Sequence, residues 1–167
     1  MIKLNLGSCD NKLSGYINID KYDDRADIKA DIFELNFYEY TIDEILFSHV
    51  IEHINPFKIS NLLRNFYKML KIKGTLVIET PDVGILFSEF KDANRQRKYE
   101  ILNGLFCTMN LTGVGDPENI ISPHLFGWTP DLIIEHLVDA GFSSGNITVV
   151  PPVIQPHYWN FRIEAKK

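Results

Sequence analysis

The sequence has few cysteines and no long hydrophobic run. Its 167 residues include two cysteines, Cys9 and Cys107. Cysteine usage this low predicts reduced thiols in an intracellular protein, although a single bridge between the two stays open. No stretch approaches the roughly 18 uninterrupted apolar residues of a membrane span, and the N-terminus lacks the apolar region of a signal peptide. These absences predict a cytoplasmic protein with no membrane partner.

The sequence also lacks an excess of positive charge. Lysine and arginine number 17 against 22 aspartates and glutamates, which gives a net charge of -5. This balance argues against broad binding to a nucleic-acid backbone, so we expect no nucleic-acid partner. The most basic run, residues 95–98, is typical of a solvated helix face, with RNA binding as the weaker alternative.

In other respects the composition is that of one ordinary folded domain. Apolar residues make up 45% of the chain and charged residues 23%, and the length leaves no room for two full-sized domains. We find no repeat, no low-complexity tract and no interdomain linker. The sequence therefore predicts a single domain over residues 1–167.

Strands and helices alternate along the chain. Apolar periodicity predicts strands at residues 2–6, 16–20, 26–30, 42–47, 75–79, 147–150 and 159–165. One helix begins at Asn55-Pro56 and closes at Gly74, a second runs from Thr129-Pro130 to Gly141, and shorter helical pieces lie within residues 85–105. This order indicates an α/β domain with a mainly parallel sheet and a C-terminal hairpin.

Two details of this pattern are specific. Residues 8–15 are too few for a complete crossover helix with its loops, so the first crossover is abbreviated. In the last strand, Trp159, Phe161 and Ile163 alternate with polar residues that include Asn160, which predicts a half-exposed strand near an edge.

Polar side chains follow several of the predicted strands. In an open parallel sheet, ligands bind beyond the carboxyl ends of the strands, so we expect these residues to converge on one edge. Asp20 at such an end can accept hydrogen bonds from both hydroxyls of a ribose, or it can simply cap a turn. In chain order, the residues at the strand ends are Gly7, Ser8, Cys9, Asp20, Asp31, Ile32, Ser48, His49, Glu52, His53, Pro81 and Asp82.

Two common kinds of site are not indicated. Residues 7–12 contain only the first of the three glycines of a dinucleotide fingerprint, which disfavours nicotinamide cofactors. His49 and His53 are spaced i, i+4 around Glu52, but the His-Glu-x-x-His order of zinc proteases is absent. We therefore expect no metal site, and we interpret His53 as hydrogen-bonded where a strand becomes a helix.

Five segments resemble the successive motifs of class I S-adenosylmethionine-dependent methyltransferases. The likeness is greatest to the small bacterial type whose chain begins at the first strand. The resemblance implies a three-layer, Rossmann-like, seven-stranded sheet, mainly parallel with an antiparallel last strand. The shortened first crossover helix departs from the family pattern. The matching segments are residues 4–9, 15–20, 30–32, 43–53 and 70–82.

The resemblance also implies where S-adenosylmethionine would bind. Gly7 would let its methionine end approach the backbone, and Ser8 would also contact the cofactor. Asp20 would bind the ribose, Asp31 and Ile32 would border the adenine, and Ser48 and His49 would lie near the sulfonium. Two residues depart from the family pattern, because Cys9 stands where a second glycine is usual and Asn5 stands where an acid is common.

Methyl transfer is an in-line displacement that needs a base only when the acceptor must lose a proton. The candidates are His124, His49 and Asp82. His124 lies in a loop before the second long helix, where it can line the acceptor site or hold the loop. We expect residues 83–128 to form a lid or insertion over the acceptor.

The sequence favours a small-molecule acceptor, such as the hydroxyl of a sugar or another metabolite. Two alternatives stay open. One is a non-catalytic S-adenosylmethionine-binding or scaffold module of the same fold, and the weaker one is RNA methylation. The oligomeric state stays open as well.

Overall fold

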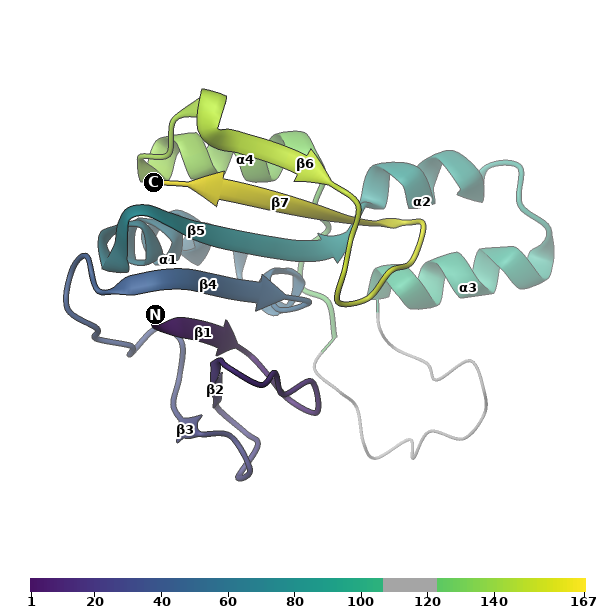
Figure 1. Cartoon of the computed structure of the whole chain (residues 1–167). Helices are drawn as coiled ribbons and strands as arrows, with labels where there is room; N and C mark the ends of the chain where they lie inside the picture. The colour runs from purple at the N-terminus through teal and green to yellow at the C-terminus, as the bar shows by residue number, and fades with distance from the viewer. Residues whose placement is uncertain (107–122) are drawn as a thin grey trace.

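The computed structural model describes residues 1–106 and 123–167, which form a seven-stranded sheet with helices (Figure 1). The strands are β1 (Lys3–Leu6), β2 (Ile17–Asp20), β3 (Ile28–Lys29), β4 (Ile42–Ser48), β5 (Leu70–Pro81), β6 (Ile147–Val150) and β7 (Asn160–Lys166). The helices are α1 (Pro56–Met69), α2 (Val83–Phe90), α3 (Arg95–Phe106) and α4 (Pro130–Ala140), with short 3-10 turns η1 (Ile51–His53) and η2 (Ser144–Asn146).

The strands lie in the order β3-β2-β1-β4-β5-β7-β6. Strands β1 to β5 pair in parallel, whereas β7 runs antiparallel to both of its neighbours, β5 and β6. The expected mainly parallel sheet, its antiparallel last strand and the C-terminal pair of antiparallel strands are confirmed. The short β3 forms one edge of the sheet and β6 forms the other.

The main hydrophobic core lies between one face of the sheet and two helices. Helices α1 and α4 lie behind the sheet in Figure 1, and Ser60 Oγ of α1 lies 3.0 Å from His136 Nδ1 of α4. Just after α4, the Phe142 ring packs on Tyr67 of α1, with ring centroids 4.9 Å apart. The helical spacing of apolar residues in α1 explains which of its faces is buried. The core cluster includes Leu4, Leu6, Ile45, Phe47, Leu76 and Ile78 from the strands and Ile59, Leu62, Leu63 and Phe66 from α1.

The opposite face of the sheet carries buried polar residues. Asn5, Asn18 and Glu79 alternate with the core residues of their strands, and they are buried although they are polar. Among the described residues, no helix lies in the connections between β1 and β4. The expected shortening of the first crossover helix is therefore complete, because loops replace that helix.

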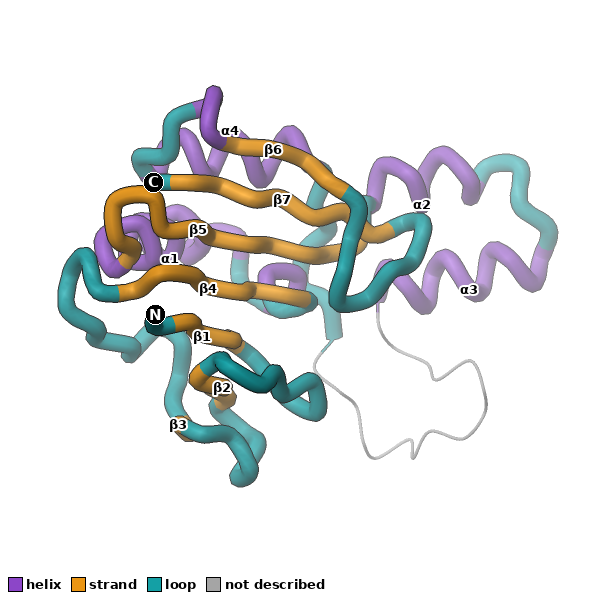
Figure 2. The backbone as a smooth tube through the Cα atoms, viewed as in Figure 1, coloured by secondary structure: helices purple, strands orange, loops and turns teal. Residues whose placement is uncertain are grey.

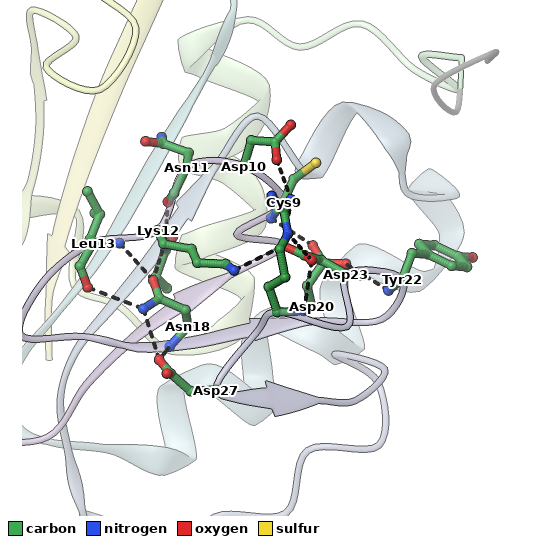
Figure 3. A network of polar contacts seen from close by, with 12 residues as sticks. Cys9, Asp10, Asn11, Lys12, Leu13, Asn18, Asp20, Tyr22, Asp23 and Asp27 are labelled. Atoms are coloured by element: carbon green, nitrogen blue, oxygen red, sulfur yellow. Dashed lines mark hydrogen bonds and ion pairs between the residues drawn. The ribbon is translucent and has the colours of Figure 1, made fainter.

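A polar network stabilises the short connection between β1 and β2 (Figure 3). The Asn18 side-chain oxygen accepts hydrogen bonds from Asn5 Nδ2, 3.0 Å away, and from the Leu13 amide, 2.9 Å away. The Asn18 amide nitrogens, main-chain and side-chain, both donate to Asp27 Oδ2, at 2.7 and 2.9 Å. Because buried polar groups must be hydrogen-bonded, this network holds the loop without a helix.

The boundary between α1 and β5 differs from the prediction. The helix ends at Met69 rather than at Gly74, and Leu70 already pairs with Ile42 of β4. The register then shifts, so that Glu44 pairs with Thr75. A Cβ at Gly74 would lie 2.9 Å from the Lys71 carbonyl oxygen and 3.0 Å from that of Ile42. Gly74 is therefore needed for this close approach within the strand, not to cap the helix.

Helices α2 and α3 form a hairpin that extends from the carboxyl end of β5 (Figure 2). They confirm the helical pieces expected within residues 85–105. From the basic run, Arg97 pairs with Glu89 at 2.7 Å and with Glu100 at 3.0 Å, and its guanidinium lies 5.0 Å from the Trp159 ring centroid. Arg97 thus contributes to packing within the chain.

Part of the predicted lid, together with Cys107, lies outside the described residues. Within the described parts of the chain, no helix combines the length and the apolar character that a membrane crossing requires.

Candidate functional site at the carboxyl edge of the sheet

The ends of three adjacent strands bring predicted site residues together. Leu6 pairs with Ile19 of β2 and with Phe47 of β4. The residues that follow, Gly7, Asp20 and Ser48, therefore lie side by side at the carboxyl edge. The expected convergence of polar residues at these three strand ends is confirmed, and this is the edge where ligands bind in open parallel sheets.

Gly7 and Cys9 shape the turn that leaves β1. Gly7 has a φ of 65°, and a Cβ there would lie 2.5 Å from Val50 Cγ2, so only glycine fits. Cys9 also has a positive φ, 41°, and its side chain is exposed. The cysteine thus adopts the left-handed region that favours the glycine usual at this position of the resembled family.

Asp20 fastens the turns after β1 and β2 to each other (Figure 3). Its Oδ2 accepts the Cys9 amide at 2.9 Å, and its Oδ1 accepts the amides of Tyr22 and Asp23 at 2.7 and 3.0 Å. A carboxylate offers about four acceptor positions, so one remains for another donor. Asp20 therefore caps these turns and retains an acceptor position on Oδ2.

Two buried hydroxyl groups at this edge have no hydrogen-bond partner in the part of the chain that the structure describes. Ser8 Oγ and Ser48 Oγ are both buried and make no hydrogen bond among the described residues. They follow β1 and end β4, which are neighbouring strands. Because most buried polar atoms are hydrogen-bonded, this pair indicates a place where a ligand would complete the bonding.

Asp31 and Ile32 lie after β3, and both make contacts within the chain. Asp31 Oδ2 accepts from Lys21 Nζ at 2.9 Å, and Oδ1 accepts the Phe33 amide at 3.0 Å. The Lys21 hydrogen bond, followed by that from Phe33, lowers the pKa of Asp31. Ile32 is half-buried and packs against the core.

His49 is held at both ring nitrogens. Its φ is 54°, and its amide donates to the Glu79 carbonyl oxygen at 2.8 Å. Nδ1 lies 3.2 Å from Glu52 Oε1, and Nε2 lies 3.3 Å from the Asn160 amide nitrogen. The Asn160 amide nitrogen can only donate, so His49 Nε2 must be unprotonated. The ring proton is therefore on Nδ1, which faces Glu52.

Glu52 is a buried acid in η1, with 2% of its surface exposed. Its Oε2 accepts the Thr80 hydroxyl at 3.0 Å. Burial alone would raise the pKa of Glu52, but the neighbouring His49 imidazole, together with the charge of His53, lowers it below the ordinary value. Glu52 is thus an ionised carboxylate inside the protein.

His53 and His124 lie against each other, with ring centroids 4.8 Å apart. His53 Nδ1 is 3.3 Å from the Pro123 carbonyl oxygen, and His124 Nδ1 is 3.2 Å from that of Leu105. Burial lowers the pKa of His124, although the charge of Glu52 opposes this effect. The structure thus gives His53 the expected hydrogen bond next to β4 and places His124 at the same edge.

A small pocket opens at the Glu52 side of this edge. Its lining includes Glu52, His124, Pro81, Val83, Leu105 and Trp128. Asp82, predicted as a candidate base, instead caps α2, because its Oδ1 accepts the Gly84 amide at 2.8 Å. The pocket thus gathers residues from η1, the end of β5, α3 and the segment before α4.

Asn160 was not predicted as part of the site. The alternation in β7 places it on the half-exposed side, yet it is only 7% exposed. It donates to the Gln155 carbonyl oxygen at 2.9 Å as well as facing His49. The β6–β7 loop folds back over Asn160, and alternation within one strand carries no signal of such cover.

Neither a protein-family model nor a curated protein matches the chain. Solved structures are similar to it over nearly its whole length. A SAM-dependent methyltransferase from Archaeoglobus fulgidus has a TM-score of 0.67 and 18% identity, covering 99% of this chain and 85% of its own. A SAM-dependent methyltransferase from Thermotoga maritima has a TM-score of 0.60 and 13% identity, covering 99% of this chain and 82% of its own. An S-adenosylmethionine-dependent methyltransferase from Mesorhizobium loti has a TM-score of 0.56 and 12% identity, covering 99% of this chain and 90% of its own. Together with the strand order, these similarities show that the chain has the fold of class I S-adenosylmethionine-dependent methyltransferases.

Proposed function

We propose that this protein is an S-adenosylmethionine-dependent methyltransferase that acts on a small-molecule acceptor. The observation that carries the proposal is a pair of buried hydroxyls, Ser8 and Ser48, that make no hydrogen bond within the described residues and lie at the carboxyl edge of a methyltransferase-like sheet. A ligand with polar groups at this edge would satisfy both hydroxyls. The similar solved structures support the same class of function.

The residues at the strand ends fit this cofactor. Ser8 and Ser48 offer hydroxyls, and Asp20 Oδ2 keeps one acceptor position for a ribose hydroxyl. The backbone of Gly7 and Cys9 keeps the turn open for the methionine end, with Asp31 and Ile32 bordering the adenine. When bound, the cofactor supplies a methyl group made electrophilic by its positive sulfur.

Of the three candidate bases, His124 suits the role best. Its Nδ1 faces the Leu105 carbonyl oxygen, so Nε2 keeps its lone pair, and its lowered pKa keeps the ring neutral at pH 7. His49 is engaged at both nitrogens and therefore positions Glu52 and Asn160. Asp82 keeps its capping bond to α2. His124 would accept the proton of an acceptor hydroxyl.

The reacting hydroxyl of the acceptor would lie at the small pocket that Glu52 and His124 line. Leu105, near the end of α3, lines the same pocket. This placement supports a covering role for residues 83–128. Arg97, in contrast, pairs with glutamates of α2 and α3, which reduces the case for RNA as the acceptor.

Isothermal titration with S-adenosylhomocysteine tests the cofactor assignment. We expect one binding event per chain, and we expect Ser48→Ala to weaken it roughly 3- to 10-fold because one hydrogen bond is lost. Ser143→Ala is the matched control, because Ser143 is exposed and precedes η2, away from the strand ends. The absence of binding at millimolar concentration would contradict the proposal.

A non-catalytic binding module of the same fold is the second candidate. The observation in its favour is that three of the acceptor positions of Asp20 are used on backbone amides. Formation of S-adenosylhomocysteine from S-adenosylmethionine, with a panel of sugars and other metabolites as acceptors, separates the two. Turnover supports the enzyme, and binding without turnover on that panel or on added RNA supports the module.

A further inference from the structure

A carboxylate and two imidazoles from distant parts of the chain meet at the pocket. Glu52 and His53 belong to η1, whereas His124 precedes α4. One potential ligand atom from each residue lies within 4.8 Å of the other two. The backbone fixes this meeting, because the Glu52 carbonyl oxygen accepts the amides of Leu125 and Phe126 at 2.7 and 3.2 Å.

Both imidazoles are held in the form that binds metal ions. The Nδ1 atoms of His53 and His124 face backbone carbonyl oxygens, which can only accept hydrogen bonds. Each Nδ1 therefore carries the proton, and each Nε2 keeps a lone pair. A metal-binding histidine commonly donates its other ring N–H to a backbone carbonyl in this way, which fixes the ring orientation.

One carboxylate oxygen of Glu52, inside the protein, is approached by His49 but accepts no hydrogen bond from the described residues. Oε2 accepts the Thr80 hydroxyl, but Oε1 is buried and has no hydrogen-bond partner among the described residues. His49 Nδ1 lies 3.2 Å from Oε1, at ion-pair distance but outside hydrogen-bond geometry. A buried charge is costly unless it is fully paired or coordinates a metal, so this oxygen is suited to a cation.

We propose that Glu52, His53 and His124 bind one divalent transition-metal ion. Imidazole ligands favour zinc, iron, cobalt or nickel over magnesium and calcium, which take oxygen ligands. Ligands about 2.1 Å from a tetrahedral ion lie about 3.4 Å apart, so side-chain rotations must draw the three atoms together by up to about 1.4 Å. Three protein ligands leave coordination positions open to the pocket.

The site gives the pocket a second way to activate an acceptor. An acceptor hydroxyl bound to the ion would release its proton to solvent water at a lower pH than an unbound hydroxyl does. His124 would then act as a ligand instead of the base, and hydroxyl acceptors would be favoured. This role in transfer rests on the proposed function, whereas the binding of the ion does not.

Metal titration of the full chain tests the site without an activity assay. Protein treated with a chelator and desalted is titrated with Zn²⁺ and with Co²⁺, whose visible absorption reports nitrogen and oxygen ligands. We expect one ion per chain with a Kd in the micromolar range or below. His124→Asn should weaken binding at least about 100-fold, beyond the 10- to 100-fold typical of outer-shell changes. His157→Asn is the control, because His157 is exposed and stacks on Trp159.

Two outcomes would overturn the metal site. One is the absence of binding at submillimolar Zn²⁺ and Co²⁺, and the other is binding that persists in the double variant His53→Asn, His124→Asn. Circular dichroism verifies folding, and these half-buried histidines are chosen because Glu52 is fully buried. Titration of the same preparations with S-adenosylhomocysteine separates the proposals: cofactor binding without metal binding overturns only the metal site, and the reverse overturns only the proposed function.

Discussion

Cys9 occupies a backbone conformation that glycine adopts without strain. Its φ of 41° lies in the left-handed region, which costs a non-glycine residue about 1–2 kcal/mol. Replacing Cys9 with glycine would remove this cost, but glycine's greater conformational freedom in the unfolded chain would offset part of the gain in stability. We expect Cys9→Gly to raise the free energy of unfolding by about 0.5–1 kcal/mol, measured by urea denaturation.

Cys9→Ala is the matched control for this prediction. Alanine removes the thiol but keeps a Cβ and therefore the cost of the positive φ, so its stability should stay close to wild type. Equal stabilisation by both variants would show that the thiol, and not the backbone conformation, is responsible.

Asp27 links the stability of the β1–β2 connection to pH. Hydrogen bonds from the backbone and then the side chain of Asn18 lower the pKa of Asp27 below its ordinary value. A lowered folded-state pKa stabilises the protein above the unfolded pKa of about 3.9, and this stability is lost as pH falls through the folded-state pKa. We expect Asp27→Asn to reduce stability at pH 7 and to flatten its decline in acid.

Urea denaturation at a series of pH values from neutral to acid measures this effect. Asp24→Asn serves as the control, since Asp24 is exposed and its carboxylate pairs with Lys29 alone among the described residues. If Asp27→Asn kept the full acid dependence of the wild type, the role assigned to the Asn18 contacts would be wrong.

For single residues at the site, the sequence predicted the place in the fold better than it predicted the hydrogen-bond partners. The sequence places Asp20, Ser48 and His49 at strand ends, and the structure brings their strand ends together. It carries no signal that Asp20 accepts three backbone amides, or that His124 meets Glu52 and His53. Such partners depend on how separate loops fold over the edge, which local periodicity does not describe.

Among the elements, the connection from β6 to β7 depends on one buried acid of β5. Glu79 is fully buried; its oxygens accept the amides of Val153 and Ile154 at 2.9 and 3.0 Å, and Arg162 pairs with it at 2.8 Å. In Glu79→Gln, an amide group would face backbone N–H groups, and Arg162 would lose its buried partner. We expect a loss of about 3 kcal/mol in the free energy of unfolding.

Glu164→Gln provides the control, because Glu164 also pairs with Arg162 at 2.8 Å but is 34% exposed in its side chain. An exposed pair of this kind contributes less than about 1 kcal/mol. Urea denaturation compares the two variants. Equal losses would contradict the assignment of Glu79 as the residue that anchors the loop.

The sequence predicted where a helix begins or ends when the residues that cap that end are neighbours in the sequence. Helix α1 begins after Asn55, whose side chain accepts the Phe57 amide, and α4 ends at Gly141, both as expected. The end of α1 was missed because the lysines after Met69 suit a helix end equally well. Pairing of Leu70 with Ile42 decides the boundary there, and that contact is not visible in a local pattern.

At the scale of the whole molecule, periodicity predicted an α/β domain with seven strands, and the resemblance placed them in one sheet with an antiparallel last strand. The sheet confirms both. What the sequence did not show is how far loops replace helices between β1 and β4. That replacement depends on the Asn5, Asn18 and Asp27 contacts, which join residues from separate strands and loops.

The central claim is that the carboxyl edge of this sheet binds S-adenosylmethionine. A crystal structure of the protein with S-adenosylhomocysteine tests it most directly. We expect the ligand across the ends of β1, β2 and β4, with a ribose hydroxyl on Asp20 and polar groups within hydrogen-bond distance of the Ser8 and Ser48 hydroxyls. Ligand bound elsewhere, or none bound in crystals soaked at millimolar concentration, would contradict the account.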